Sequence, residues 1–289
     1  MNPILDKTQP SPSTQANLQR RYRQCYERIA EEDLVKPLEG NKHVRNVPFL
    51  RMIGEVRGKT VLDVGSAQGL VLDGLRTAAL TVCVDLAQAY MRVARERGHQ
   101  AVVGDGEALP FRAGAFDVVI CTGVLEHVLN AEAVVRQVER ILKPDGSLFV
   151  LVPWKEDLGK YEAFEGVYEF THLRSFDEEA IRKLFRSFRI AKRRGVEPKI
   201  ERPPHLKLLD CFPAFVGRFF QFAGRIGRRV PWRLQKYYWK AHYAYWGWYW
   251  GQLARLPAWD WLWLWFYPPF HMIFEFKPRT SQDVSGRRP

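Results

Sequence analysis

Three aspartates stand at the ends of short apolar runs, and their side chains could bind a nucleoside. Asp63 belongs to the first run, Asp85 follows the second and Asp105 follows the third. A carboxylate can accept hydrogen bonds from both hydroxyls of a ribose, and Asp85 comes 22 residues after Asp63, a spacing typical of ribose-binding acids in doubly wound sheets. Each acid taken singly could instead cap a helix. Their repetition at successive run ends favours one nucleotide site.

Two glycines follow the first run and indicate that a ligand approaches the backbone closely. Gly65 and Gly69 let the chain turn sharply and expose main-chain N–H groups at the start of a helix, which we expect over residues 69–75. Ser66 and Ala67 lie between them. Glycine-rich turns also follow strands that bind nothing, so the turn carries weight only together with the acids.

Further polar residues follow the third and fourth apolar runs. Gly106 and Glu107 come directly after Asp105, and Thr122 follows the run that ends at Cys121. In open parallel sheets, ligands bind outside the carboxyl ends of the strands. The sequence therefore places these residues along one edge of a sheet.

The elements that must position these residues follow from the apolar pattern. Short apolar runs bounded by turn residues are typical of buried parallel strands. Asp177 is expected to cap a helix that ends at Phe188. The expected strands are Thr60–Val64, Thr81–Val84, Ala101–Gly104, Phe116–Cys121, a fifth within 141–150, Arg189–Val196 and Met272–Lys277. This pattern predicts an α/β fold.

In this order, the residues closely resemble the class I S-adenosylmethionine-dependent methyltransferases, in particular the branch of ubiquinone-biosynthesis and other small-molecule methyltransferases. The resemblance extends over about residues 60–277. It implies a doubly wound, mostly parallel sheet of seven strands, whose last two form an antiparallel hairpin at one edge. It also implies that S-adenosylmethionine is the cofactor, with a binding set of Asp63, Gly65, Ser66, Gly69, Asp85, Leu86, Asp105, Gly106, Glu107 and Thr122.

The resemblance gives the members of this set separate parts of the cofactor. It puts Asp63 and both glycines of the turn around the methionine portion. It puts Asp85 at the ribose and Leu86 on the adenine face. Asp105 and Gly106 would meet the adenine edge.

Two histidines are candidate general bases if the acceptor is a hydroxyl. Imidazole titrates near neutrality and could take the hydroxyl proton, and the family places the segments of His127 and His172 near the methyl group of the cofactor. His127 could equally serve only to orient its loop. Quinone-pathway members that bind a metal carry a Glu three residues before their Glu-His pair, whereas Gly123 stands there in this chain. We therefore predict no metal site at Glu126 and His127.

The N-terminal part is expected to be a polar tail followed by two helices. Met1–Gln15 is rich in Ser, Thr, Pro and Gln and lacks a basic-then-apolar signal, which predicts disorder and argues against export. Apolar spacing predicts helices over Asn17–Ile29 and His43–Met52. Tyr22 and Tyr26 on the first helix could form a lid over the cofactor or pack in the ordinary way.

Positive charge and tryptophan gather in the C-terminal third. Residues 1–188 carry a net charge of −1, whereas residues 189–279 carry +12, and nine of the ten tryptophans lie between Trp232 and Trp265. The sixth and seventh strands are separated by about seventy residues, far more than a hairpin loop needs. A helical, aromatic and basic insert is therefore expected over residues 197–270.

Three interpretations of this insert stay open. Arg and Lys beside amphipathic Trp and Tyr rings favour an anionic membrane surface or an amphiphilic, lipid-linked substrate. The aromatic residues could instead form the core of a helical subdomain. Arg clusters with aromatic residues also suit nucleic acid, the weakest of the three because no RNA-binding module is recognisable. No run reaches the roughly eighteen uninterrupted apolar residues of a membrane span.

The sequence thus predicts a methyltransferase that acts on a hydroxyl or carbon of a small, amphiphilic or lipid-linked acceptor. The alternatives are an RNA-directed or tRNA-directed methyltransferase and a cofactor-binding protein without activity. The four cysteines lack CxxC spacing, which predicts reduced thiols in a cytoplasmic protein. Peripheral binding to the inner face of the membrane would follow from the first interpretation of the insert. The expected parts are residues 1–54, the cofactor-binding core 55–196, the insert 197–270, the final strand 271–279 and a tail 280–289.

Overall fold

The structure, a computed structural model, describes residues 12–34, 41–161, 170, 172–198 and 269–279. The chain divides into two compact units. The first comprises Met1–Val35, Ile53–Arg193 and Ile273–Pro289, and the second Lys36–Met52 and Arg194–Met272. The predicted insert lies outside the described residues apart from its first two and last two positions, and the tail 280–289 lies outside them too.

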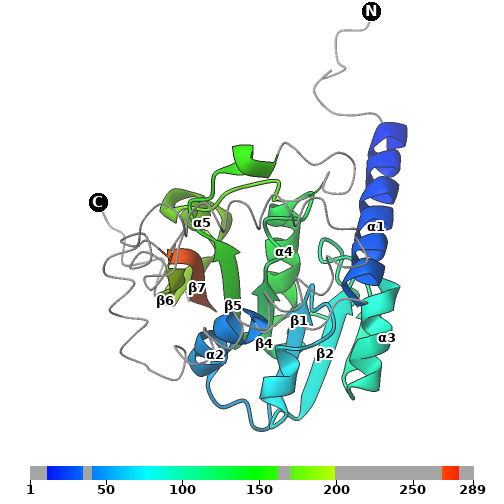
Figure 1. Cartoon of the computed structure of the whole chain (residues 1–289). Helices are drawn as coiled ribbons and strands as arrows, with labels where there is room; N and C mark the ends of the chain where they lie inside the picture. Colours follow the sequence, from blue (N-terminus) through cyan, green and yellow to red (C-terminus); the bar gives the residue numbers. More distant parts are fainter. Residues whose placement is uncertain (1–11, 35–40, 162–169, 171, 199–268, 280–289) are drawn as a thin grey trace, which may run out of the picture. The chain divides into compact units, whose positions relative to one another are not determined.

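A sheet of seven strands organises the fold (Figure 1). In spatial order the strands run β3-β2-β1-β4-β5-β7-β6. β1 pairs in parallel with β2 and β4, and the β2–β3 and β4–β5 pairs are also parallel. The predicted α/β fold with a mostly parallel sheet is therefore confirmed. The strands are β1 (Thr60–Val64), β2 (Leu80–Asp85), β3 (Gln100–Val103), β4 (Phe116–Thr122), β5 (Leu142–Pro153), β6 (Phe188–Pro198) and β7 (Pro269–Pro278).

The core lies along the central strands. Leu62 of β1, Ile120 of β4 and Val150 of β5 are fully buried. A parallel strand that is buried on both faces has a nearly continuous apolar sequence. This explains why the positions of these strands could be predicted closely from the sequence. The predicted bounds of β1 match the observed ones, and those of the other strands differ by at most three residues.

Five α-helices stand among the described residues, and their ends follow side-chain caps where these are seen. Asn130 accepts a hydrogen bond from the backbone N–H of Ala133 at the start of α4, at 2.9 Å. Asp177 accepts one from Ala180 at 2.8 Å, which confirms the predicted cap of α5. None of the helices in these ranges has the length and apolar character that crossing a bilayer demands. The helices are α1 (Pro12–Leu34), α2 (Asn41–Ile53), α3 (Gln88–Glu96), α4 (Ala131–Ile141) and α5 (Glu178–Leu184).

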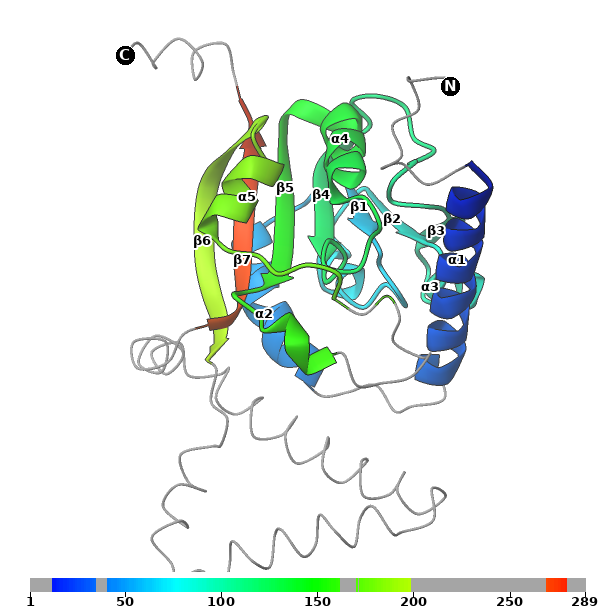
Figure 2. The same cartoon turned by 90° about the horizontal axis from the view of Figure 1, so that it is seen from above.

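The last two strands form the predicted antiparallel hairpin at the sheet edge. The backbone N–H of Arg279 donates to the carbonyl of Ser187, and Lys192 Nζ lies 3.0 Å from Glu275 Oε2, so β6 and β7 run in opposite directions. Figure 2 shows β7 also running against β5, in agreement with the contact from Lys277 Nζ to the Asp145 carbonyl. The chain therefore enters β7 from the edge of the sheet that carries the carboxyl ends of β4 and β5.

Three expectations about local structure are wrong. The helix predicted to end at Phe188 ends at Leu184, and Phe188 begins β6 instead. The helix expected over 69–75 is a 3₁₀ turn, η1 (Leu72–Leu75). Both Ala67 and Gly69 have positive φ, at 44° and 75°, which no right-handed helix accommodates, so the turn after β1 extends too far for a full helix to form before β2. The tail predicted over Met1–Gln15 is shorter than expected, because its last four residues, Pro12 onward, begin α1. The rest of that tail lies outside the described residues.

Candidate active site

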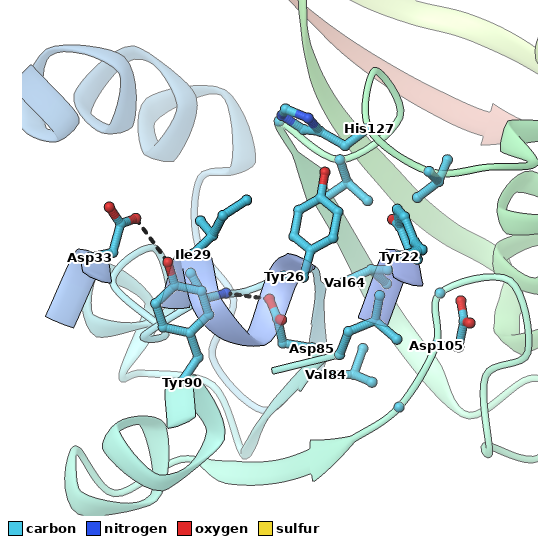
Figure 3. Close-up of a pocket in the computed structure, with 18 residues that line it drawn as sticks. Tyr22, Tyr26, Ile29, Asp33, Val64, Val84, Asp85, Tyr90, Asp105 and His127 are labelled. Atoms are coloured by element: carbon cyan, nitrogen blue, oxygen red, sulfur yellow. Dashed lines mark hydrogen bonds between the residues drawn. The ribbon is translucent and has the colours of Figure 1, made fainter. Parts of the chain in front are cut away.

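A cavity of about 260 Å³ lies where the carboxyl ends of β1, β2 and β4 meet helix α1 (Figure 3). This is the edge at which parallel sheets bind ligands, because the turns that follow the strands converge there. Every residue that lines it belongs to the first unit. The lining residues are Tyr22, Tyr26, Ile29, Asp33, Val64, Gly65, Ala67, Val84, Asp85, Leu86, Tyr90, Gly104, Asp105, Gly106, Gly123, Val124, His127 and Val128.

The structure brings half of the predicted site residues to the cavity wall. The lining includes Gly65, Asp85, Leu86, Asp105, Gly106 and His127. The other predicted residues do not line it: Asp63, Ser66, Gly69, Glu107, Thr122 and His172. Their proposed roles toward the cofactor stay predictions.

Asp85 connects the ends of the first two strands. Its Oδ2 accepts a hydrogen bond from the backbone of Ala67 and its Oδ1 accepts one from Ala87, both at 3.0 Å. Burial raises the pKa of Asp85, and these backbone hydrogen bonds oppose that rise. Ala67 stands where class I methyltransferases usually have a glycine, and the Asp85 carboxylate helps to hold it at a φ of 44°.

Asp63 is a buried acid with unused hydrogen-bonding capacity. Its side chain is 1% exposed, and neither carboxylate oxygen has a hydrogen-bond partner among the described residues. Burial raises the pKa of Asp63 well above its usual value, and the charge of Asp85 adds to the rise. Two acids with raised pKa values beside one cavity match a cationic ligand, since a positive charge there would favour their ionised forms. S-adenosylmethionine, which carries a sulfonium and an ammonium, fits this requirement.

The turn at Gly65 brings the first strand against the loop after β4. Gly65 has a φ of +66°, and a Cβ atom there would overlap the Val124 side chain. Any other residue would therefore be strained and would push on the loop that carries Glu126 and His127.

Helix α1 covers the cavity and is attached to its rim by polar contacts. Arg23 Nη2 lies 3.3 Å from Asp105 Oδ2. Glu27 accepts hydrogen bonds from the backbone at the start of α3, including one from Gln88 at 2.8 Å. The Tyr90 hydroxyl donates to Asp33 at 2.8 Å (Figure 3).

Two tyrosines of α1 lie directly on the cavity. Tyr22 and Tyr26 line it with ring centroids 4.8 Å apart, and the Tyr22 ring also packs edge-on against Phe170 at 5.2 Å. The Tyr26 hydroxyl donates to the Phe170 carbonyl at 3.2 Å. Both roles considered for these residues, a lid over the cofactor and ordinary packing, stay predictions.

A cluster of polar side chains lies beside the cavity, around His127 and His172. The two imidazole centroids lie 4.7 Å apart. Burial lowers the pKa of His127 to about 4, and the charge of His172 acts in the same direction. His127 is therefore neutral at physiological pH. Its ring hydrogen-bonds the backbone of Phe170, whereas its Nδ1 is buried with no partner in the part of the chain that the structure describes.

Sequence reasoning missed one member of this group, Glu156. Its carboxylate contacts Nδ1 of His172 in a short hydrogen bond. The signal was available, because Glu156 follows the end of β5 just as the other site residues follow their strands.

Potential metal-binding atoms also converge here. Glu126, His127 and His172 each offer one suitable atom within 4.8 Å of the others. The prediction of no metal considered only the local motif around Gly123 and could not anticipate that His172 would fold against it. Glu156 hydrogen-bonds one nitrogen of His172, an arrangement that is also found at imidazoles that bind a metal. The absence of a metal site stays a prediction.

The sheet order and the cavity define the class of protein, and a family comparison agrees with them. Residues 62–150 match a family described as a methyltransferase domain. The chain therefore contains a class I S-adenosylmethionine-dependent methyltransferase domain, and S-adenosylmethionine is the cofactor of that domain.

Relatives of known name make the likeness more specific. The chain is 32% identical over 126 residues to the ubiquinone biosynthesis O-methyltransferase of Bordetella avium, a match that covers 41% of this chain and 52% of that protein. It is 36% identical over 123 residues to the enzyme of the same name from Xanthomonas axonopodis pv. citri, covering 40% and 51%. The chain thus spans about half the length of the curated relatives it matches.

Solved structures show the same fold at low sequence identity. An S-adenosylmethionine-dependent methyltransferase of Thermotoga maritima aligns with a TM-score of 0.50 and 20% identity, over 60% of this chain and 82% of that one. A chain from the Haloferax volcanii complex of the Trm112 methyltransferase activator with a proposed methyltransferase aligns with a TM-score of 0.52 and 19% identity, over 67% and 85%.

Proposed function

We propose that the protein transfers the methyl group of S-adenosylmethionine to a hydroxyl of a small, amphiphilic acceptor. The observation that carries the proposal is the pair of imidazoles, His127 and His172, 4.7 Å apart beside the cofactor cavity. A hydroxyl must lose its proton as it attacks the methyl group, and a base placed there accelerates that step. The curated relatives are named O-methyltransferases, which favours the same acceptor atom.

The residues of the cavity have separate tasks in this reaction. S-adenosylmethionine, when bound, supplies a methyl group already activated on a sulfonium. Asp85 would accept hydrogen bonds from the ribose, and Asp63 would balance the positive charge. Tyr22 and Tyr26 would exclude water from above. Much of the catalysis would then come from alignment in a dry site.

The amphiphilic character of the acceptor is proposed from the sequence between β6 and β7. That segment contains nine of the ten tryptophans together with most of the excess positive charge. Aromatic rings beside Arg and Lys favour the headgroup level of an anionic bilayer. We therefore extend the proposal to peripheral binding of an anionic membrane surface from which the acceptor is taken.

A labelling experiment tests the methyl acceptor. The full chain is incubated with S-adenosylmethionine carrying a labelled methyl group and, separately, with a long-chain alkyl phenol, an alkyl catechol, a lipid extract and bulk tRNA. Label in a methyl ether from the phenol, catechol or lipid pool is the expected result. Label in tRNA would favour the RNA-directed alternative. Calorimetric binding of the cofactor with no labelled product would favour a binding protein.

A second experiment tests the proposed general-base role of the two histidines. The turnover of His127→Ala and of His172→Ala is compared with that of the wild type. Losses below about tenfold in both would remove the proton-accepting role, because general-base catalysis typically contributes 10²-fold or more.

A third experiment tests the proposed binding to a membrane surface. The chain is sedimented with vesicles of anionic and of neutral phospholipid at several salt concentrations. Binding that is specific to anionic vesicles and weakens with salt is expected.

A further inference from the structure

Glu156 is a mostly buried carboxylate that pairs with an imidazole of the active site. Its Oε2 contacts Nδ1 of His172. The side chains of Glu156 and His172 are 8% and 17% exposed. A carboxylate this deeply buried is costly unless its partner compensates it, so the pair is a built feature and not a surface contact.

The segments that carry the pair are held side by side. The backbone N–H of Lys155 donates to the Phe176 carbonyl at 2.8 Å, and the N–H of Glu156 donates to Ser175 Oγ at 2.8 Å. Trp154 and Phe176 form a parallel bridge next to these bonds. The chain after β5 is therefore joined to the segment that follows His172, and their relative register is fixed.

The same segment is joined to the loop of His127. The N–H of Leu173 donates to the Glu126 carbonyl at 2.6 Å, and the Arg174 guanidinium donates to the carbonyls of Leu125 and Leu129. His172 itself has a φ of 32°. Such a conformation costs about 1 kcal/mol or more and persists only where the surroundings hold it, which is common at functional sites.

The charged and titratable groups around His127 and His172 come from four parts of the chain. Glu156 lies on the segment after β5, Glu126 and His127 on the loop after β4, and Arg174 on the segment of His172 itself. From α1, Tyr26 faces the His127 ring at 6.2 Å. His127, with its pKa lowered to about 4, is a weak base, whereas His172 has a carboxylate against its Nδ1.

We propose that Glu156 is a positioning residue that accepts the Nδ1–H of His172 and so leaves Nε2 as the atom that takes the acceptor proton. This inference rests on the proposed hydroxyl methyltransferase activity. In the step, the hydroxyl oxygen forms a bond to the methyl carbon with its lone pair. The carbon–sulfur bond breaks and its electron pair stays on sulfur. The hydroxyl proton moves to Nε2 of His172 and is later released to water, while the Glu156 carboxylate offsets the imidazolium charge.

The first test reads the tautomer of His172 and needs no acceptor. Long-range ¹H–¹⁵N spectra of histidine-labelled full chain, with the demethylated cofactor bound, distinguish the Nδ1–H from the Nε2–H form. The signal of His172 is assigned by its loss in His172→Gln. The Nδ1–H form is expected in the wild type and in Glu156→Gln, whose amide oxygen still accepts, and its loss is expected in Glu156→Ala.

The second test measures methyl transfer to an alkyl phenol or catechol. Glu156→Ala should lower kcat about 10²-fold or more, with the cofactor Kd unchanged, and Glu156→Gln should retain more activity than Glu156→Ala. Asp157→Asn is the matched control, because the neighbouring exposed Asp157 loses the same charge and should show neither effect.

Two results would overturn the proposal: an Nε2–H form of His172 in the wild type, or a kcat in Glu156→Ala within about threefold of the control. A wild-type chain that methylates no hydroxyl would contradict the proposed function instead. In that case the tautomer spectra still decide whether Glu156 orients His172.

Discussion

The two ends of the active site are built in different ways. The cofactor end is made by residues that directly follow strands, such as Asp85, whose carboxylate bonds backbone groups of two adjacent turns. The proposed acceptor end is made by three separate segments, around His127, Glu156 and His172, which backbone hydrogen bonds join and whose side chains contact one another. At the cofactor end the backbone turns themselves shape the cavity, whereas at the acceptor end the proposed chemistry depends on individual side chains that can be replaced one at a time.

The largest effect is expected at the cofactor end from Gly65→Ala. The new Cβ would overlap Val124, and the positive φ would add a strain of about 1 kcal/mol. We expect the Kd for S-adenosylmethionine, measured by calorimetry, to rise about 10²-fold. Gly114→Ala is the control, because Gly114 has a similar φ of +59°, yet a Cβ atom added there would meet no described atom within 4 Å.

Comparison of the two glycines separates overlap from strain. Gly114→Ala should lower the Tm by a few degrees and leave the cofactor Kd unchanged. Adding Val124→Ala to Gly65→Ala should recover part of the lost affinity, because it removes the overlapping methyl groups. Equal losses of affinity in Gly65→Ala and Gly114→Ala would contradict the view that backbone shape at the cavity determines cofactor binding.

A smaller effect is expected from Asp85→Asn. The amide keeps one acceptor for the Ala67 N–H but loses the charge and one acceptor for the ribose, so cofactor affinity should fall about 10-fold to 10²-fold. Burial raises the pKa of Asp85, so acidification protonates it earlier than an exposed aspartate. Wild-type affinity should therefore fall as the pH is lowered, and the variant should lack this component.

The matched control for that substitution is Asp117, which lies near the amino end of the central strand β4, away from the cavity. Asp117 on β4 bonds Thr60 and Lys143, and its pKa is lowered to about 2, with burial opposing those hydrogen bonds. Asp117→Asn should reduce thermal stability and leave the cofactor Kd unchanged. An equal loss of affinity in both variants would mean that the effect of Asp85→Asn comes from general destabilisation.

The contrast between the two ends also explains what the sequence could predict. Strand runs and the residues directly after them are local signals, so the strands and the cavity-lining Asp85, Asp105 and Gly65 were located from spacing. Glu156 also follows a strand, but its pairing with His172, 16 positions away through irregular segments without periodicity, is not a local signal. The helix expected over 69–75 failed because Gly69 has a φ of 75°, in a turn that a tertiary contact from Ala67 to Asp85 helps to hold.

A change of a few degrees is expected from Asp63→Asn. The Asp63 carboxylate is buried without a hydrogen-bond partner within the described ranges, and a buried amide costs less than a buried charge. Without cofactor the variant should melt roughly 2–4 °C higher than the wild type near pH 8, yet bind S-adenosylmethionine more weakly. Scanning calorimetry with calorimetric titration measures both quantities.

The pH dependence of that difference has a definite sign. The folded-state pKa of Asp63 is raised, so ionisation destabilises the fold as the pH rises from the unfolded value of about 3.9 toward the folded one. Below about pH 4 the carboxyl is neutral in both states and the two melting temperatures should approach each other. A variant that melts lower than the wild type at every pH would show that Asp63 stabilises the fold through contacts of its own.

The smallest effect is expected from metal removal. Gly123 stands where the metal-binding members of the quinone-pathway branch have a Glu. Dialysis against EDTA should therefore leave both kcat and the cofactor Kd unchanged. A loss of kcat that Mg²⁺ or Zn²⁺ restores, at constant Kd, would instead give the acceptor end a metal held through Glu126, His127 and His172. Such a metal would bind Nε2 of His172 while Glu156 keeps the Nδ1–H, so it would compete with the acceptor proton for that nitrogen. The same titration, followed through the Nε2 signal of His172, therefore distinguishes a general base from a metal ligand.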